Sequence, residues 1–412
     1  MNKKRIMLAL FLQYIGKILA IFISMMLAKM LGVDLYGEYA YFLSLANIIM
    51  LPVIAGIPQL ILKEFGKTSN IFNDDVVNWS SKFIIINMFI ISFFYTVYST
   101  GRISYEVIFL FLYFVFSRGL SQRNSAIITA CKYHDITLLN SSILQPFLFL
   151  TLILLSERAF NIVDVFYLLN YSFTISLVAS YFFIFLVVKN KTHGLKNSKN
   201  SKNSKSSYIG KIIPFSLLTL ITTFNVELST LIVANYMSMS DTAIFRVASQ
   251  FSIALTLSMS LVNSMISSEI SKEYHSNNIK ALQGVMRKSV LFNSALSFFV
   301  FIILVLFGEE VISLTFGDEY LIAYKPMLIL AFGQLINAFL GSSGTLLNMA
   351  GYEKVSLKLS VFSLIFSSLS LLLFIDYGVI AAAFTSAFGL IFWKLALTIY
   401  AYKKLRIKTW VH

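Results

Sequence analysis

The sequence has little charge and almost none of the residues that build disulfides or metal centres. Charged residues make up 13% of its 412 residues, against roughly 25% in soluble globular proteins. The single cysteine, Cys131, excludes an intramolecular disulfide and a multi-cysteine metal site. The four histidines are scattered, and no Walker A sequence is present. We therefore expect no metal centre, no cofactor and no ATP hydrolysis by a P-loop.

Long apolar stretches take up most of the chain. Hydrophobic residues make up 58% of it, and the mean hydropathy is +0.78. Each stretch is close to or above the roughly 17–25 residues that cross a bilayer as a helix. Backbone polar groups in lipid must be satisfied within the segment, so the sequence predicts an all-α polytopic membrane protein with twelve transmembrane helices. The stretches are 6–30, 37–62, 83–99, 105–128, 138–155, 163–188, 212–236, 242–267, 289–307, 325–350, 355–375 and 379–402.

Positive charge alternates between the gaps that separate these stretches. The even-numbered gaps and both ends of the chain hold most of the 33 Lys and Arg residues. The odd-numbered gaps carry only Arg102 and Arg158 clear of a helix and are rich in acid. Because Lys and Arg mark cytoplasmic loops, both termini are expected in the cytoplasm. The net charge of +14 then faces the anionic inner leaflet, and we expect no nucleic-acid partner.

One gap divides the chain into halves. Residues 189–211 read KNKTHGLKNSKNSKNSKSSYIGK, a low-complexity composition that cannot bury enough apolar surface to fold. We predict an N-terminal lobe at 1–188 with spans one to six, a basic cytoplasmic linker at 189–211, and a C-terminal lobe at 212–412 with spans seven to twelve. Two halves of equal span number and orientation indicate a parallel duplication.

A lysine lies near the middle of the first predicted span. Lys17 shares a helical face with Gln13 and Ser24. A charge at the bilayer centre costs roughly 2.5–3.5 kcal/mol on insertion scales. Snorkelling from mid-span would require a reach of about 15 Å at 1.5 Å per residue, which exceeds one side chain. We therefore predict that this face lines a water-filled cavity.

The seventh and eighth spans bring an acid and a base into the membrane. Glu227 is either a protonatable site that couples transport to an ion gradient or one partner of a structural ion pair with Lys17 or Arg246. Arg246 enters span eight with Gln250 beside it. It is either an interfacial anchor or a group at a cavity mouth that binds phosphate through two hydrogen bonds.

Further polar residues lie in spans four, ten and twelve. Lys394 can snorkel to the inner interface or contribute to the cavity. Gln334 and Asn337 share a face of span ten with glycines, which suits either helix packing or cavity lining. Arg118 and Arg123 lie toward the inner end of span four and are read as topology determinants or vestibule charges.

Cations outnumber acids among these intramembrane residues. Lys17, Arg246 and Lys394 stand against one clear anion, Glu227. A cationic cavity indicates an anionic substrate.

Two segments resemble parts of bacterial polysaccharide flippases. Residues 318–353 read DEYLIAYKPMLILAFGQLINAFLGSSGTLLNMAGYE, and they resemble the tenth span of that family, with an acid–Tyr start, GQ-x-x-N, a glycine-containing turn, LLNM and G-x-E. Residues 27–45, LAKMLGVDLYGEYAYFLSL, resemble the family's first loop, which has LG, an acid and YG-x-Y. The segment from Arg123 to Pro146 resembles the passage from span four to span five more loosely.

The resemblance implies a polysaccharide or O-antigen repeat-unit flippase of the multidrug/oligosaccharidyl-lipid/polysaccharide exporter superfamily. Such a protein has two six-helix lobes around a central cavity and works by alternating access, without catalysis. Its substrate is a polyprenyl-diphosphate-linked oligosaccharide, flipped from the inner to the outer leaflet of the bacterial cytoplasmic membrane. The bilayer, a polysaccharide polymerase and chain-length proteins are the implied partners.

Two rival functions remain. A drug or metabolite antiporter of the same superfamily would be expected to use acidic cavity residues, which Lys17 argues against. A polymerase or glycosyltransferase would carry a large periplasmic loop or a cytoplasmic catalytic domain, and the predicted gaps hold neither. Lipid II flippases of the superfamily have fourteen spans, so twelve spans argue against that branch.

Overall fold

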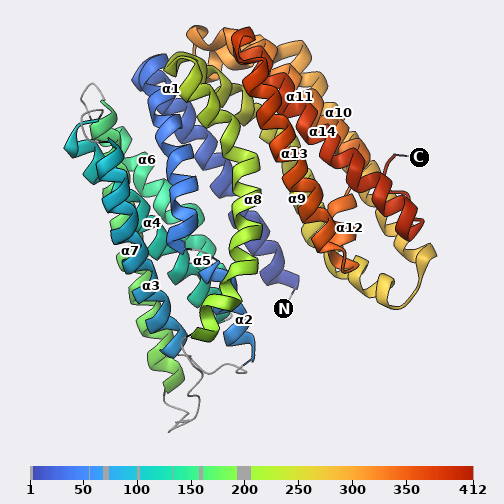
Figure 1. Ribbon diagram of the computed structural model, residues 1–412, viewed down its shortest axis with the longest axis horizontal. Coiled ribbons are helices and arrows are strands. Elements are labelled where there is room, and N and C mark those ends of the chain that lie inside the picture. Colours follow the sequence, from blue (N-terminus) through green and yellow to red (C-terminus); the bar gives the residue numbers. More distant parts are fainter. Residues whose placement is uncertain are drawn as a thin grey trace. The chain divides into compact units, whose positions relative to one another are not determined.

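The described part of the chain is almost entirely helical. The computed structural model describes residues 3–54, 56–67, 74–99, 103–131, 133–156, 161–192 and 206–411 (Figure 1). No strand occurs among these residues, and the predicted all-α class is confirmed. Residues 193–205, the centre of the predicted linker, lie outside the described residues.

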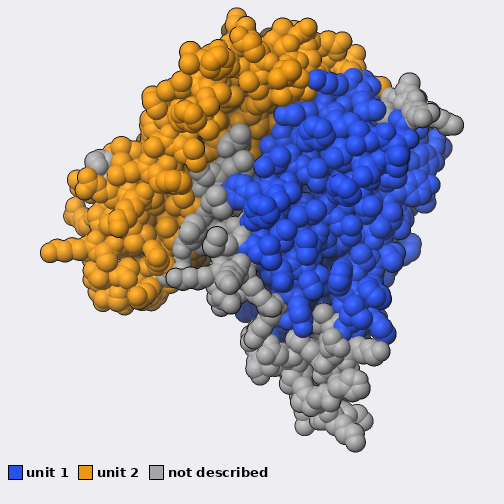
Figure 2. Space-filling view, turned by 180° about the vertical axis from the view of Figure 1, so that it is seen from behind, with its two compact units in different colours: residues 1–31, 45–220 blue, residues 32–44, 221–412 orange. Residues whose placement is uncertain are grey.

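Contacts divide the chain into two compact units, coloured separately in Figure 2. Unit 1 comprises residues 1–31 and 45–220, and unit 2 comprises residues 32–44 and 221–412. The chain passes from unit 1 to unit 2 within α1 (Lys3–Ile54), at a kink where Gly32 has φ 72° and ψ 178°. Only glycine adopts such a backbone readily. The boundary at residue 220 falls within α8 (Ser206–Tyr236).

Unit 1 is built around α4 (Tyr105–Ala130), which contacts α2, α3, α5 and α7. A π-helical turn precedes Pro146, a residue that cannot donate a backbone hydrogen bond. Besides its parts of α1 and α8, the unit contains α2 (Ile57–Lys67), α3 (Asp74–Ser99), α5 (His134–Leu138), η1 (Leu139–Leu144), α6 (Gln145–Leu155) and α7 (Ile162–Thr192).

A buried arginine ties α4 to α3 in unit 1. Arg123 is 3% exposed, and it donates from Nε to Ser80 Oγ at 3.0 Å and from Nη2 to the Val77 carbonyl at 3.0 Å. Nη1 donates to Asn124 Oδ1, and Asn124 in turn donates to Ser180 on α7. Arg123 therefore holds three helices together, a packing role that the topology argument did not predict.

Unit 2 is built around α11, which packs against α9, α10 and α14. Besides its parts of α1 and α8, its elements are α9 (Met239–His275), α10 (Ile279–Thr315), η2 (Asp318–Ala323), α11 (Tyr324–Leu340), α12 (Ser343–Met349), α13 (Glu353–Leu373), η3 (Ile375–Tyr377) and α14 (Gly378–Leu405).

The segment after α14 folds back onto unit 2. Gln283 on α10 both donates to the Lys408 carbonyl and accepts from the Lys408 N–H, at 2.8 and 2.9 Å. The Val411 N–H donates to the Phe339 carbonyl at 3.0 Å. Ile407 is fully buried in a cluster with Leu282 of α10. The C-terminal segment is thus part of the packed unit.

Eight segments of the described chain are long and apolar enough to cross a membrane. The first, Phe11–Ile54, covers two of the predicted stretches. The helices α4, α8 and α9 coincide with three further predicted spans but are not among the eight, and they carry Arg123, Glu227 and Arg246. A polytopic helical membrane fold is therefore clear, while the exact count of twelve stays a prediction.

Candidate functional site

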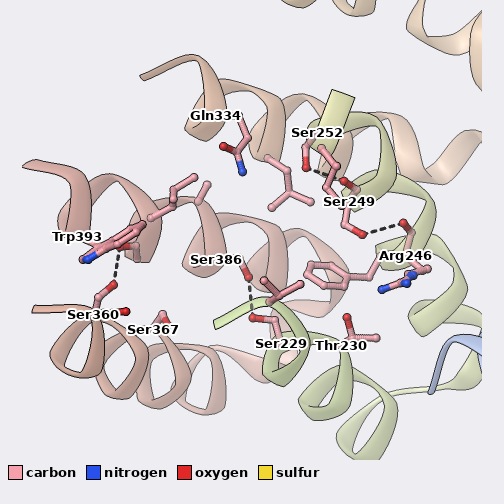
Figure 3. A pocket seen from close by; sticks show the side chains of 18 residues that line it. Ser229, Thr230, Arg246, Ser249, Ser252, Gln334, Ser360, Ser367, Ser386 and Trp393 are labelled. Atoms are coloured by element: carbon pink, nitrogen blue, oxygen red, sulfur yellow. Dashed lines mark hydrogen bonds between the residues drawn. The ribbon is translucent and has the colours of Figure 1, made fainter. Parts of the chain in front are cut away.

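Unit 2 contains a pocket in which hydroxyl and amide groups stand among apolar side chains. The pocket has a volume of about 390 Å³, within the range of small-molecule sites. Residues of α8, α9, α11, α13 and α14 form its walls (Figure 3). Its polar and aromatic lining consists of Ser229, Thr230, Phe245, Arg246, Ser249, Ser252, Gln334, Ser360, Ser363, Ser367, Ser386 and Trp393.

The one charged residue in the described part of the lining forms an ion pair. Arg246 Nη1 lies 3.7 Å from Glu227 Oε2, and the two side chains are 23% and 8% exposed. Ser238 and Asp241 form a capping box that fixes the start of α9, which places Arg246 near the second turn of that helix. The structure therefore contains the predicted alternative in which Glu227 pairs with Arg246. The two charges cancel at this edge of the pocket.

The serine hydroxyls of the pocket donate mainly to helix carbonyls. Ser249, Ser252 and Ser367 each donate to the carbonyl three residues earlier, at 2.8, 2.8 and 3.1 Å. Ser363 donates to the Gly389 carbonyl on α14 at 2.7 Å. A hydroxyl that has used its hydrogen retains oxygen lone pairs that accept. These serines therefore present acceptors.

Donors occupy other parts of the wall. Gln334 Oε1 accepts from Asn337 Nδ2 at 3.0 Å, which leaves the Gln334 amide nitrogen directed toward the pocket in Figure 3. The Nε1 atom of Trp393 is buried, and it has no hydrogen-bond partner in the described part of the chain. The pocket therefore combines hydroxyl acceptors, two uncharged N–H donors and an aromatic ring.

Lys394 lies beside the pocket and not in its lining. Its side chain is 5% exposed, and Nζ donates to the Gly341 carbonyl at 3.0 Å. Gly341 ends α11 with φ 67°, so the ammonium group sits at the negative end of that helix dipole. This position is a helix C-terminal cap, and the sequence-based alternatives did not include it.

The two segments that resemble the flippase family meet in unit 2. Tyr36 is fully buried, accepts a hydrogen bond from Gln250 Nε2 at 3.0 Å, and packs edge-on against Tyr320 with ring centroids 6.1 Å apart. Gly37 lies against the backbone carbonyl of Met239 so closely that a Cβ atom would collide with it. The hydrogen bond to Tyr36 joins Gln250 to α1, and Gln250 is not among the residues that line the pocket.

Lys17, Gln13 and Ser24 belong to unit 1. Lys17 is half-buried, with Nζ 5.8 Å from the Tyr14 ring centroid. Gln13 is exposed and Ser24 is buried. The adjacent Gly16 lies against Ser142, where a Cβ atom would clash.

Sequence reasoning found only part of the pocket. Arg246 and Gln334 line it, and Glu227 and Asn337 contact these two residues. The serines were missed as a group, although one signal was readable. Ser360, Ser363 and Ser367 stand at helical spacing on α13, so they share one face. Within the described residues, no group of three His, Cys, Asp or Glu side chains could hold a metal ion.

The family and structure comparisons agree on the architecture. Residues 214–373 match the MatE family model. An inward-facing multidrug resistance MATE family transporter of the MOP superfamily is similar to this chain with a TM-score of 0.71 and 14% identity, over 96% of this chain and 94% of that one. This chain has the MATE-type fold. No curated protein sequence matches.

Other proteins with the MATE-type fold include both a lipid flippase and drug transporters. The lipid II flippase MurJ, in an inward closed conformation, has a TM-score of 0.73 and 14% identity, over 96% of this chain and 87% of that one. An outward-facing multidrug resistance MATE family transporter has a TM-score of 0.62 and 15% identity, over 97% and 95%. At these identities the likeness establishes the fold, and the choice of substrate depends on the site.

Proposed function

We propose that this protein flips a polyprenyl-diphosphate-linked oligosaccharide repeat unit, an O-antigen or capsule precursor, from the inner to the outer leaflet of the bacterial cytoplasmic membrane. The observation that carries the proposal is the hydroxyl-rich pocket with Arg246 at its edge, set among membrane helices of a MATE-type fold. Hydroxyl and amide groups suit a sugar chain, and a guanidinium suits a phosphate or an acidic sugar.

The ion pair supplies a way to couple substrate binding to an ion gradient. A diphosphate or acidic sugar that binds Arg246 competes with Glu227, which lies 3.7 Å from it. Loss of this ion pair makes the charge on Glu227, whose side chain is 8% exposed, more costly, and so favours uptake of a proton or a sodium ion by its carboxylate. Lys17, in unit 1, is a separate candidate for binding negative charge of the substrate. The lipid tail stays in the bilayer, and no covalent step is required.

The runner-up function is a cation-coupled drug or metabolite antiporter. The similarity to multidrug MATE transporters favours it. A cationic drug, however, would meet Arg246 in the pocket lining, and Glu227 is not among the lining residues. Since Glu227 is already paired with Arg246, the described lining offers a cation no carboxylate of its own, and this disfavours the alternative.

Deletion of the gene in its host is the first test. We expect loss of the surface polysaccharide, with lipid-linked repeat units accumulating on the cytoplasmic leaflet. Complementation with Arg246→Ala should leave the polymer absent while the protein remains in the membrane. The exposed Lys272→Ala serves as a matched control, because Lys272 is 80% exposed and pairs only with its neighbour Glu273 in the described chain.

Two outcomes would contradict the proposal. A deletion strain with intact polymer and raised sensitivity to cationic dyes such as ethidium would establish the antiporter. Full complementation by Arg246→Ala would show that export does not depend on the charged edge of this pocket.

A further inference from the structure

The unit 2 pocket is close to uncharged in spite of its arginine. Arg246 is the single charged residue among the described residues of the lining, and Glu227 lies 3.7 Å from its Nη1 atom. In Figure 3 the guanidinium lies at one end of the pocket and the Trp393 ring at the other. The body of the pocket between them is lined by hydroxyl and amide groups set among apolar side chains such as Ile253, Leu330 and Leu390. A ligand in that body therefore needs no charge.

The described walls of the pocket offer more hydrogen-bond acceptors than donors. Three serine hydroxyls donate to backbone carbonyls, so their oxygens remain free to accept from a ligand. They belong to Ser252, Ser363 and Ser367. Ser386 donates to Ser229 at 3.0 Å, so the hydrogen on Ser229 is left to a further partner. The uncharged donors are few, and Gln334 supplies one of them. Many acceptors with a few donors suit a molecule that carries several O–H groups.

The aromatic end adds a second requirement. Trp393 lines the pocket, and its Nε1–H lacks a hydrogen-bond partner within the described chain. A buried donor that makes no hydrogen bond costs free energy, because it has lost its contact with water. An indole offers an apolar face and one donor at its edge. A ligand that has an apolar C–H face and a hydroxyl at its rim would satisfy both.

We propose that this pocket binds a single neutral sugar ring, with the apolar face of the ring against Trp393 and its hydroxyls on the serine acceptors. The inference rests on the proposed function and names the part of the repeat unit that this pocket takes. An uncharged, polyhydroxylated ring matches the array of acceptors, whereas a phosphate would meet oxygen lone pairs on most sides. An organic cation would lose hydration and gain no carboxylate from the lining.

Direct binding to the full-length protein in nanodiscs tests this inference. The chain has three tryptophans, so W79F/W410F leaves Trp393 as the only indole. The probes are the methyl glycosides of glucose, galactose and N-acetylglucosamine, with glucuronate and tetraphenylphosphonium as charged comparisons. We expect at least one neutral glycoside to change the Trp393 emission saturably. Tetraphenylphosphonium should bind several-fold more weakly, because the described lining offers it no carboxylate, and glucuronate reports whether a sugar carboxylate reaches Arg246.

Paired serine substitutions connect the signal to the pocket. Ser229→Ala/Ser386→Ala removes both partners of one hydrogen bond and leaves no orphaned group, so the fold should persist. We expect glycoside binding to weaken about tenfold, the effect of one to two lost hydrogen bonds. Ser81→Ala/Ser141→Ala is the matched control, because each hydroxyl donates to the backbone carbonyl four residues earlier in unit 1, at 3.0 and 2.8 Å. The control should bind as the parent does.

Each outcome has a distinct meaning. No saturable response to any neutral glycoside, in the emission of Trp393 or in the melting temperature of the unsubstituted protein, overturns the inference. Preferential binding of tetraphenylphosphonium overturns it too and supports an organic-cation pocket.

Sugar binding together with intact polymer in the deletion strain keeps the sugar site but rejects the flippase. Loss of polymer without sugar binding keeps the flippase and rejects this pocket. Export that falls in Ser229→Ala/Ser386→Ala ties the sugar to the lipid-linked chain and not to a free sugar.

Discussion

Arg246 on α9 pairs with Glu227 on α8, with 3.7 Å between Nη1 and Oε2. Both groups belong to unit 2, and both lie in stretches predicted to cross the membrane. The pairing turns an excess of intramembrane cations, as the sequence alone suggests it, into a locally neutral edge of the pocket. In the proposed mechanism, a substrate anion competes with Glu227 for the Arg246 guanidinium.

Removing one charge of this ion pair should destabilise the protein more than its share of the loss when both charges are removed. We expect Arg246→Met and Glu227→Met each to lower the free energy of unfolding by about 1–3 kcal/mol, because a poorly hydrated charge remains. Arg246→Met/Glu227→Met should be less destabilised than the sum of the two. Thermal unfolding in detergent measures all three. Additive losses would show that the two groups do not interact in solution.

A substitution of Glu227 should show whether this residue couples export to an ion gradient. Glu227→Gln keeps the shape of the side chain and removes its charge and its proton exchange. We expect export in this variant to become insensitive to collapse of the proton or sodium gradient and to fall by at least about tenfold, as for loss of one charge-assisted contact. Polymer synthesis with and without an ionophore is the measurement. Export that still falls on collapse of the gradient would place the coupling site elsewhere.

Lys17 in unit 1 should be required for export but not for insertion. It is half-buried in α1 with Nζ near the Tyr14 ring. We expect Lys17→Ala to abolish surface polysaccharide while the protein still reaches the membrane, and Lys17→Arg to retain part of the activity because it keeps the charge. Normal polysaccharide from Lys17→Ala would exclude a role in binding the substrate.

Lys394 should matter for stability more than for substrate charge. Its Nζ caps the end of α11 through the Gly341 carbonyl at 3.0 Å. We expect Lys394→Met to fill similar space, lose the cap and lower the free energy of unfolding by about 1–3 kcal/mol. A melting curve beside an export assay distinguishes the roles. Unchanged stability with lost export would instead place this ammonium group on the transport path.

Gly37 is required by a close approach of two backbones. A Cβ atom at this position would collide with the Met239 carbonyl, so Gly37→Ala must displace α1 from the start of α9. We expect a loss of at least about 2 kcal/mol, typical of overpacking in a buried contact. Gly284→Ala is the matched control, because a Cβ atom there meets nothing within 4 Å and alanine favours a helix. Equal melting temperatures for the two variants would contradict this account.

Composition and periodicity were enough to determine the helical membrane fold. Apolar stretches of this length leave the backbone no partner except its own helix, so the element type follows from local chemistry. Most predicted boundaries lie within a few residues of the observed helices, as at 105–128 and α4. The sequence also pointed to Arg246, Glu227 and Gln334, because a polar group within an apolar run is visible without a structure.

Only the tertiary structure decided which polar groups share a site. The pocket draws on five helices spread over the second half of the chain, and no spacing rule relates Ser229 on α8 to Ser386 on α14, although their hydroxyls are 3.0 Å apart. Lys394 and Gly341 are likewise joined only by packing. Residue type sets what a side chain can donate or accept, whereas the arrangement of the helices sets its partner. For that reason a helix cap, a packing arginine and a substrate contact look the same in the sequence.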